Sequence, residues 1–230
     1  MEKSKLGSPR TFLALIVAAA IVVAAVLVVL SQLGNSGGGD SASNVGKLYS
    51  GIPQNGTTLG KRSAPVTVYL YEDFQCPYCG QFSRDTFPEL VDRYVRDGKV
   101  RMVSEPLAFL GPDSVQAAKA ALAAAEQNRY WPYYSLLFEN QGTENSGYVT
   151  GDFLQRLARN TPGLDVSKWN AQRTSSSFDA ELRAAQSKAQ SAGVTSTPTL
   201  LLSGPNGQKK LVGVKDYGQI SAAIDQVDGS

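Results

Sequence analysis

The sequence predicts an α/β domain with the element order β-α-β, a long helical block and then β-β-α, preceded by one apolar segment. Three observations lead to this prediction. Residues 12–30 are apolar without interruption and carry no charge. Residues 66–71 (V-T-V-Y-L-Y) have the β-branched and aromatic composition of a buried strand, directly before the two cysteines of the chain. Residues 199–203 (T-L-L-L-S) read as a later strand, and the Gly-Pro-Asn-Gly run that follows is typical of a hairpin turn.

The apolar segment from residue 12 to residue 30 is about long enough to cross a ~30 Å hydrocarbon core as a helix. The basic residues that precede it are Lys3, Lys5 and Arg10. Because positive charge favours the cytoplasmic side, we expect residues 1–11 to be cytoplasmic, residues 12–30 to be a single-pass anchor in the cell membrane, and the rest to be extracytoplasmic. A cleaved signal peptide is the alternative, but its apolar region usually spans only ~7–15 residues. Either reading places the domain in an oxidising compartment.

After the apolar segment, residues 31–50 form a Gly/Ser-rich stretch that predicts a flexible linker. Residues 51–230 are enough for one well-cored domain. The formal net charge is +2 and no basic cluster occurs, which argues against nucleic acid as a partner. The chain has no histidine, which excludes Ser-His-Asp and Cys-His catalysis and histidine-ligated metals.

The two cysteines, Cys76 and Cys79, stand in the run D-F-Q-C-P-Y-C. A predicted strand precedes them and helical spacing follows them, so Cys76 is expected at a helix N-terminus, where unpaired N–H groups and the helix dipole favour a thiolate. A purely structural disulfide that closed so short a loop would restrict the conformations of the unfolded chain only a little. Zinc needs about four ligands, and a third cysteine or a histidine is lacking. The pair therefore predicts a redox-active disulfide that needs no metal or cofactor.

The other elements follow in order along the chain. We expect the helix after the cysteines to end at Gly98, and Pro106 to close the next strand. The predicted ranges are a strand at 100–104, helices at 113–127, from 132 onward, at 151–159, 166–173 and 178–192, a strand at 210–214 and a closing helix at 217–227. The helices between about 107 and 192 are thus an insertion between two halves of sheet. The aromatic residues of this insertion are interpreted as core rather than as a peptide groove: Trp131, Tyr133, Tyr134 and Phe138.

This order of elements is that of the thioredoxin fold with an inserted helical domain. The matching motifs are Leu59-Gly60, A-P-V-T-V at 64–68, D-F-Q-C-P-Y-C, Pro106-Leu107 and V-T-S-T-P-T at 194–199. From Ile52 to its end, the chain resembles the DsbA-like thiol:disulfide oxidoreductases of the thioredoxin superfamily, with a membrane anchor. The resemblance implies that Cys76 is the exposed, attacked sulfur and Cys79 its buried partner, with Pro77 and Tyr78 as the dipeptide between them. It also implies that Thr197-Pro198 is the cis-proline position that faces the cysteines and binds substrate.

The function that this resemblance implies is an oxidase that donates its disulfide to exported cysteine-containing proteins. Its redox partner would be a membrane protein of the DsbB or vitamin K epoxide reductase type. A disulfide reductase or isomerase, or an anchored peptide-binding module of chaperone type, are the alternatives. The sequence leaves open the direction of transfer, the clients and the oligomeric state.

Two departures from the family pattern lead to further expectations. Where DsbA has a histidine, this chain has Tyr78, whose neutral phenol cannot stabilise a thiolate by charge; we therefore expect a milder oxidant, approximately −200 to −230 mV rather than ~−120 mV. Many relatives bury an acid six residues before the first cysteine, but here Leu70 holds that position. Glu72 and Asp73 are interpreted as solvated loop residues, although Glu72 or water could exchange protons with Cys79.

Overall fold

The computed structural model describes residues 22, 23, 26 and 42–229. The folded domain is the compact unit Ala42–Ser230. Apart from residues 22, 23 and 26, the predicted cytoplasmic segment 1–11 and anchor 12–30 lie outside the described residues. Within the described part of the chain, no helix is both long enough and apolar enough to cross a membrane.

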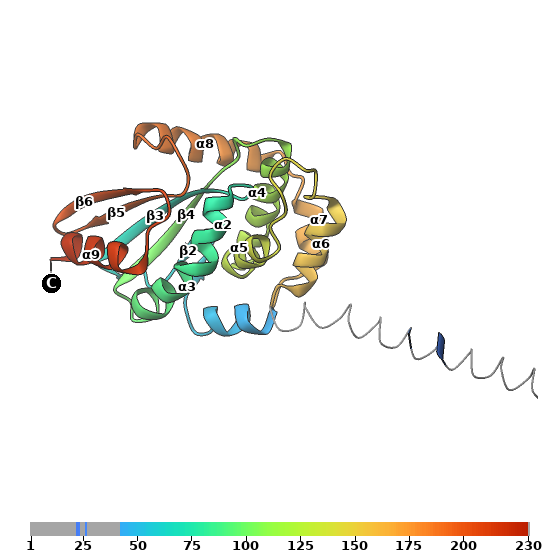
Figure 1. Cartoon of the computed structure of the whole chain (residues 1–230), viewed down its shortest axis with the longest axis horizontal. Coiled ribbons are helices and arrows are strands. Elements are labelled where there is room, and N and C mark those ends of the chain that lie inside the picture. Colours follow the sequence, from blue (N-terminus) through green and yellow to red (C-terminus); the bar gives the residue numbers. More distant parts are fainter. Residues whose placement is uncertain (1–21, 24–25, 27–41, 230) are drawn as a thin grey trace, which may run out of the picture. The chain divides into compact units, whose positions relative to one another are not determined.

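A six-stranded sheet forms the centre of the domain, with the strand order β1-β2-β4-β3-β5-β6 (Figure 1). Its strands are β1 (Gln54–Asn55), β2 (Thr58–Leu59), β3 (Val66–Asp73), β4 (Val100–Leu107), β5 (Thr199–Gly204) and β6 (Gly207–Val212). Strand β3 pairs in parallel with β4 and antiparallel with β5, and β5 pairs antiparallel with β6. The predicted β-α-β and β-β halves therefore meet at β3, in the middle of the sheet.

The helices that surround the sheet include a block inserted between β4 and β5. The helices from α2 onward are α2 (Pro77–Asp85), α3 (Phe87–Leu90), the π-helix η1 (Val91–Val95), α4 (Pro112–Ala125), α5 (Tyr130–Glu139), α6 (Gly151–Asn160), α7 (Val166–Gln172), α8 (Ser177–Ser191) and α9 (Tyr217–Asp228). The helix expected between the cysteines and Gly98 is thus divided into three pieces, and Gly98 ends it with a φ of 78°. Helices α6 and α7 lie at the opposite end of the domain from β5 and β6 (Figure 1).

Strand β3 is buried on both faces, which explains its almost continuous apolar sequence. Successive side chains of a strand point to opposite faces of a sheet. Val66, Val68 and Leu70 belong to the main hydrophobic core. Tyr69 and Tyr71 belong to a smaller cluster that includes residues of α8. The face on which a β3 side chain lies therefore decides whether it meets the interior of the domain or the layer under α8.

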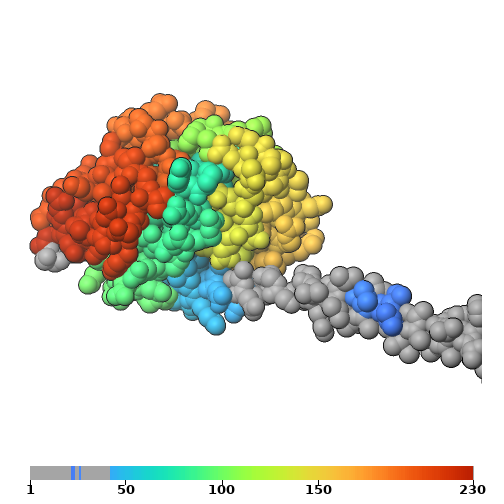
Figure 2. Space-filling model, viewed as in Figure 1, coloured from blue at the N-terminus to red at the C-terminus, as the bar shows by residue number. Residues whose placement is uncertain are grey.

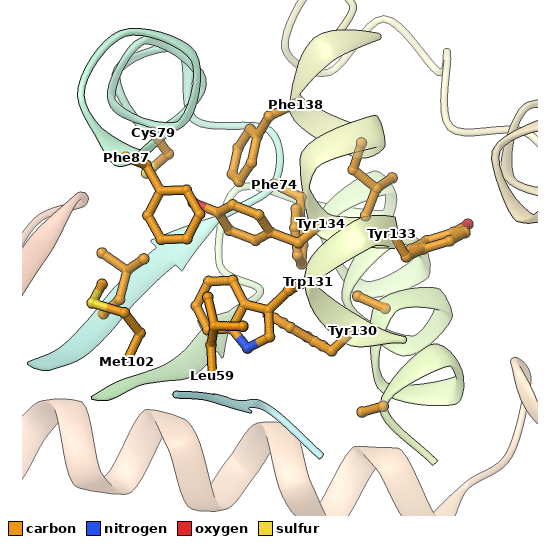
Figure 3. Close-up of a cluster of buried hydrophobic side chains, with 14 of the residues drawn as sticks. Leu59, Phe74, Cys79, Phe87, Met102, Tyr130, Trp131, Tyr133, Tyr134 and Phe138 are labelled. Carbon is orange, nitrogen blue, oxygen red and sulfur yellow. The ribbon is translucent and has the colours of Figure 1, made fainter. Parts of the chain in front are cut away.

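The main core contains an aromatic cluster contributed largely by α5 (Figure 3). Trp131, Tyr133, Tyr134 and Phe138 are all buried, which confirms that they are core residues. The rings of Phe87 and Trp131 are stacked, with centroids 5.2 Å apart and planes 9° apart. Because each large aromatic ring removes much apolar area from water, this cluster holds the inserted helices against α2 and the sheet.

Strands β3 and β4 extend beyond the C-terminal ends that the sequence predicted. Strand β3 continues to Asp73 and β4 to Leu107, because their parallel register persists and places Glu72 opposite Pro106. The expectation that Pro106 closes its strand is therefore wrong. The pairing of β2 with β4 covers only Met102 and Val103. At Pro106, strand β4 is therefore paired on only one side, and the N–H that proline lacks is tolerated there.

A helix at residues 42–49 was not expected, since the sequence predicted a linker through residue 50. Val45 is 2% exposed and Tyr49 is 4% exposed. The Tyr49 hydroxyl lies 2.7 Å from Ser135 Oγ on α5. The linker prediction is therefore wrong for its C-terminal part, because apolar side chains four residues apart form one helical face that packs on the domain.

Candidate active site

The cysteine pair lies where the chain leaves β3 and enters α2. Cys76 is the N-cap of α2, with φ −65° and ψ 118°, and Pro77 occupies the first helical position. Proline fits this position because its fixed φ is helical and the N–H that it lacks would have had no partner. The Cys76 N–H donates to the carbonyl of Asp73 at 2.9 Å, so the turn from strand to helix takes only three residues. Cys79 follows one turn later on the buried side of the helix.

Both cysteines are free thiols in this structure, and their environments differ. The pKa of Cys76 is lowered to about 6, first by a hydrogen bond from the Cys79 side chain and also by hydrogen bonds from the Thr197 side chain and from backbone groups of Cys79 and Tyr78; burial opposes this shift. The pKa of Cys79 is raised well above its usual value by burial, by its hydrogen bond to Cys76 and by the charge of Glu72. The reduced pair therefore favours a Cys76 thiolate beside a Cys79 thiol.

Cys76 is less exposed than the family resemblance implied. It is 6% exposed, while Cys79 is fully buried. Its Sγ atom lies 3.5 Å from the Thr197 carbonyl oxygen, which covers one side of the sulfur. Its neighbours along the chain remain accessible: Pro77 is exposed, and Tyr78 is 65% exposed. The sulfur thus lies just beneath the surface rather than on it.

The Thr197–Pro198 peptide bond is cis, as the motif suggested. The Pro198 carbonyl accepts a hydrogen bond from Gly213 N at 2.8 Å, and the Thr199 hydroxyl donates to the Ser196 carbonyl at 2.7 Å. The contact of Cys76 Sγ with the Thr197 carbonyl joins the two segments, so the structure brings together all of the predicted site residues: Cys76, Pro77, Tyr78, Cys79, Thr197 and Pro198. Figure 2 shows the surface of α2 (teal) between the insertion (yellow) and the C-terminal elements (orange to red).

Glu72 is not a solvated loop residue, because β3 carries it into the interior. It is 3% exposed, and it lies on the same face of β3 as Leu70, two residues earlier. Its Oε2 accepts a hydrogen bond from the Tyr134 hydroxyl at 2.7 Å. The pKa of Glu72 is raised well above its usual value by burial and by the charge of Cys76, while the Tyr134 hydrogen bond opposes this shift. A buried carboxyl group thus lies close behind the cysteine pair.

Asp73 is also buried, with no exposed surface, and it organises the turn before Cys76. Its Oδ1 accepts hydrogen bonds from Gln75 N at 2.9 Å and from Ser114 Oγ at 2.6 Å. Its Oδ2 accepts from the N–H groups of Phe109 and Leu110 at 3.0 and 3.1 Å. Four donors compensate for the burial of this side chain, so the interpretation of Asp73 as a solvated loop residue is wrong.

The loop after α5 binds the same turn from the other side. Gln141 Nε2 donates to the carbonyls of Phe74 and Cys76 at 2.9 and 3.0 Å. The Gln75 side chain accepts from Asn145 N at 2.7 Å. The sequence reasoning missed these contacts, and the only local signal for them was the polar Gln75 between two buried segments. The insertion therefore fixes the backbone that carries Cys76.

Within the described part of the chain, no three cysteine, aspartate or glutamate side chains are grouped so that they could hold a metal ion. The chemistry that this geometry allows is exchange at sulfur, with proton exchange at the buried thiol. A thiolate at a helix N-terminus is a good leaving group in such exchange.

A family model described as thioredoxin matches residues 53–226 of this chain. The chain belongs to the thioredoxin family. Among the relatives of this thioredoxin-family protein, the probable disulfide bond formation protein D of Bacillus anthracis is 26% identical over 172 residues, which cover 74% of this chain and 76% of that protein. The oxidised crystal structure of BdbD from Bacillus subtilis has a TM-score of 0.67 and 25% identity, and the match covers 76% of this chain and 96% of that one. DsbA of Chlamydia trachomatis has a TM-score of 0.66 and 23% identity, covering 74% and 90%.

These similarities and the cysteine geometry agree on the chemistry. The sequence relative is named for disulfide bond formation. The region that the thioredoxin family model matches includes both cysteines and the cis-proline segment. This member of the thioredoxin family is a thiol–disulfide oxidoreductase.

Proposed function

We propose that this protein is a membrane-anchored oxidase that donates the Cys76–Cys79 disulfide to exported proteins. The observation that carries the proposal is the different placement of the two sulfurs. Cys76 is the N-cap of α2 and its pKa is lowered to about 6, whereas Cys79 is fully buried, which raises its pKa. A stabilised thiolate stabilises the reduced form, and a pair whose reduced form is stabilised gives up its disulfide readily.

The transfer proceeds in two exchanges. A client thiolate attacks Cys76 Sγ in the disulfide, the bond to Cys79 breaks, and Cys79 takes the electron pair and then a proton. A second client thiolate attacks the client sulfur of this mixed disulfide, and Cys76 leaves as a thiolate. The client has then lost two electrons to the cysteine pair. The Thr197 backbone, beside the cis-Pro198, supports an extended client segment next to Cys76.

The reduction potential that we propose is that of a mild oxidant, approximately −200 to −230 mV. Tyr78 supplies no charge that would stabilise the thiolate. The Cys76 pKa of about 6 lies between the thiol pKa values of thioredoxin, ~7, and DsbA, ~3.5. Equilibration of the purified domain with glutathione buffers measures the potential directly. A value near ~−120 mV would refute the argument from Tyr78.

The direction of transfer is tested by thiol trapping in intact cells. An oxidase is expected to rest mainly as the disulfide, whereas a resting dithiol would support the reductase or isomerase reading. Replacement of Cys79 by Ala should leave clients covalently bound to Cys76 as mixed disulfides. A chain that lacks both cysteines serves as the matched control, and if it still binds the same clients, the protein is a binding module instead.

The location and the redox partner are part of the same proposal. Residues 12–30 would anchor the chain with its N-terminus in the cytoplasm and its domain outside, where a membrane redox partner of the DsbB or vitamin K epoxide reductase type reoxidises Cys76 and Cys79. In cells whose wall has been removed, added protease should degrade the domain of the full chain, which should also stay in the membrane fraction. Deletion of residues 1–30 should abolish the membrane association; protection from the protease would contradict the orientation.

A further inference from the structure

One amide side chain, that of Gln141, joins the end of α5 to the turn that carries Cys76. Its Nε2 atom donates to the Phe74 carbonyl at 2.9 Å and to the Cys76 carbonyl at 3.0 Å. An amide nitrogen has two N–H groups, so this turn occupies both donors of the side chain. The exchange steps described above assign no part to this amide.

The space beside Gln141 is adapted to it. A Cβ atom at Gly80 would come into contact with Gln141 Oε1 and would lie 2.8 Å from Arg84 Nη1. Because residue 80 has no side chain, the amide can lie directly against α2, one turn after Cys76. Arg84 Nη1 in turn donates to the Phe138 carbonyl at 2.7 Å. Helix α2 and the end of α5 are thus joined by polar contacts at two places.

An apolar contact fixes the point from which Gln141 reaches the turn. The rings of Phe74 and Phe138 face each other with centroids 5.1 Å apart, and both side chains are buried (Figure 3). Gln141 follows Phe138 by only three residues. The position of its amide is therefore set by packing as well as by its own hydrogen bonds.

The orientation of the Cys76 carbonyl decides where the sulfur lies relative to α2. Cys76 is the N-cap of this helix, with φ −65° and ψ 118°, and its carbonyl accepts the first helical hydrogen bond, from Gly80 N at 3.1 Å. Backbone N–H groups of Tyr78 and Cys79 donate to Cys76 Sγ. Rotation about ψ of Cys76 would move the sulfur away from them. A donor that holds the carbonyl therefore also holds the sulfur against these two groups.

We propose that Gln141 is a positioning residue for disulfide exchange: by donating to the Cys76 carbonyl, it keeps the Cys76 sulfur where the start of α2 can stabilise its negative charge. The inference rests on the exchange at Cys76 and Cys79 proposed above. In its second step, a bond forms between two client sulfurs, the bond from Cys76 Sγ to the client breaks, and Cys76 keeps the electron pair. The helix stabilises this charge only if the sulfur lies against its N–H groups.

The proposed effect is one of position and not of charge. Gln141 is uncharged, so its replacement by another uncharged residue leaves the charges around the sulfur as they are. The titratable groups that act on Cys76 are Cys79 on the same helix and Glu72 on β3, and both remain in place. A change in the ionisation of Cys76 would therefore report a displaced sulfur.

The test compares truncations of two neighbouring amide side chains in the full chain, purified in detergent. Gln141→Ala removes the donor to the turn. Asn140→Ala is the matched control, because Asn140 Nδ2 donates within its own helix, to the Leu136 carbonyl at 2.9 Å. Gln141→Met keeps most of the length of the side chain but has no donor, so it separates the loss of hydrogen bonds from the loss of packing.

Two measurements report the stabilisation of the thiolate: the pH dependence of Cys76 alkylation in the reduced protein, and the equilibrium constant with glutathione. In Gln141→Ala and Gln141→Met, the half-maximal rate of alkylation should move to higher pH. The disulfide should become about two- to tenfold harder to reduce, the range that one net hydrogen bond supplies. Asn140→Ala should leave both measurements unchanged. Lower stability of the Gln141 variants with both measurements unchanged is what a purely structural amide would give, and it would overturn the proposal.

The remaining outcomes are equally decisive. A shift in Gln141→Ala that is absent from Gln141→Met would assign the effect to packing and overturn the role of the hydrogen bonds, and so would an equal shift in Asn140→Ala. The proposed function fails in a different way. A wild type that gives no midpoint with glutathione, or whose alkylation is half-maximal near the usual thiol value of about 8.5, would refute the redox pair or its stabilised thiolate. A wild type with the expected profile and unchanged Gln141 variants would refute only the role of Gln141.

Discussion

The alkylation of Cys76 as a function of pH provides a quantitative test of the site. With a pKa of about 6, Cys76 should be roughly 90% thiolate at pH 7, whereas a thiol with the usual value of ~8.5 is about 3% ionised. The gain in thiolate is partly offset, because nucleophilicity falls with pKa with a Brønsted coefficient of ~0.4–0.5, or about 13-fold for this difference. Cys76 should therefore react only about two to three times faster than an ordinary thiol at pH 7, but about 20 times faster at pH 5.

The assay is the rate of iodoacetamide incorporation into the reduced domain from pH 4.5 to pH 9, with the labelled peptide identified by mass. The rate should be half-maximal near pH 6 and constant above pH 7. Labelling should be confined to Cys76, because Cys79 is fully buried and burial raises its pKa.

Cys79→Ala is the informative perturbation, since the Cys79 side chain is the largest cause of the low pKa of Cys76. Its removal should shift the half-maximal rate to higher pH, and Cys76 should remain the residue that is labelled. If the profile of this variant coincided with that of the wild type, the hydrogen bond between the two sulfurs could not be the cause. If the wild-type rate were half-maximal near pH 8.5, the stabilised thiolate and the argument for disulfide donation would both be refuted.

Two further predictions concern the turn before the cysteines. Ser114→Ala removes the 2.6 Å hydrogen bond to the buried carboxylate of Asp73, and it should lower the free energy of unfolding of the oxidised domain by about 1.5–3 kcal/mol in urea titrations; a loss below ~0.5 kcal/mol would show that the remaining donors suffice. Gly80→Ala would bring a Cβ atom into contact with Gln141 Oε1, so we expect it to destabilise the wild type but to cost less in a Gln141→Ala background. Additive costs in that double-mutant cycle would contradict the contact.

Local patterns predicted most of the fold, because alternating and helical periodicities report burial directly. The strand at 66–71 and the hairpin after residue 199 were recognisable from composition alone. The end of β3 was not, because Glu72 and Asp73 follow the apolar run and charged residues usually mark its end. Their burial depends on partners far along the chain: Tyr134 for Glu72 and Ser114 for Asp73.

The site shows the same division between local and distant causes. The position of Cys76 at a helix start follows from the residues around it, and so does the role of Pro77. The hydrogen bond from Gln141 to the Cys76 carbonyl joins residues that are 65 positions apart, and no local pattern predicts it. One signal for the burial of Glu72 was available in the sequence. Leu70 holds the position at which many relatives bury an acid, and Glu72, two residues later, belongs to the same face of the strand.

The short helix at 42–49 has a practical consequence for work on the isolated catalytic part. A fragment begun at residue 51, where the composition changes, would lose Val45 and Tyr49 from the interior and leave the Ser135 hydroxyl without its partner. The apolar groove thus uncovered would promote self-association during purification. Expression should therefore begin at or before Ala42, so that the preparation retains the segment that closes this side of the molecule.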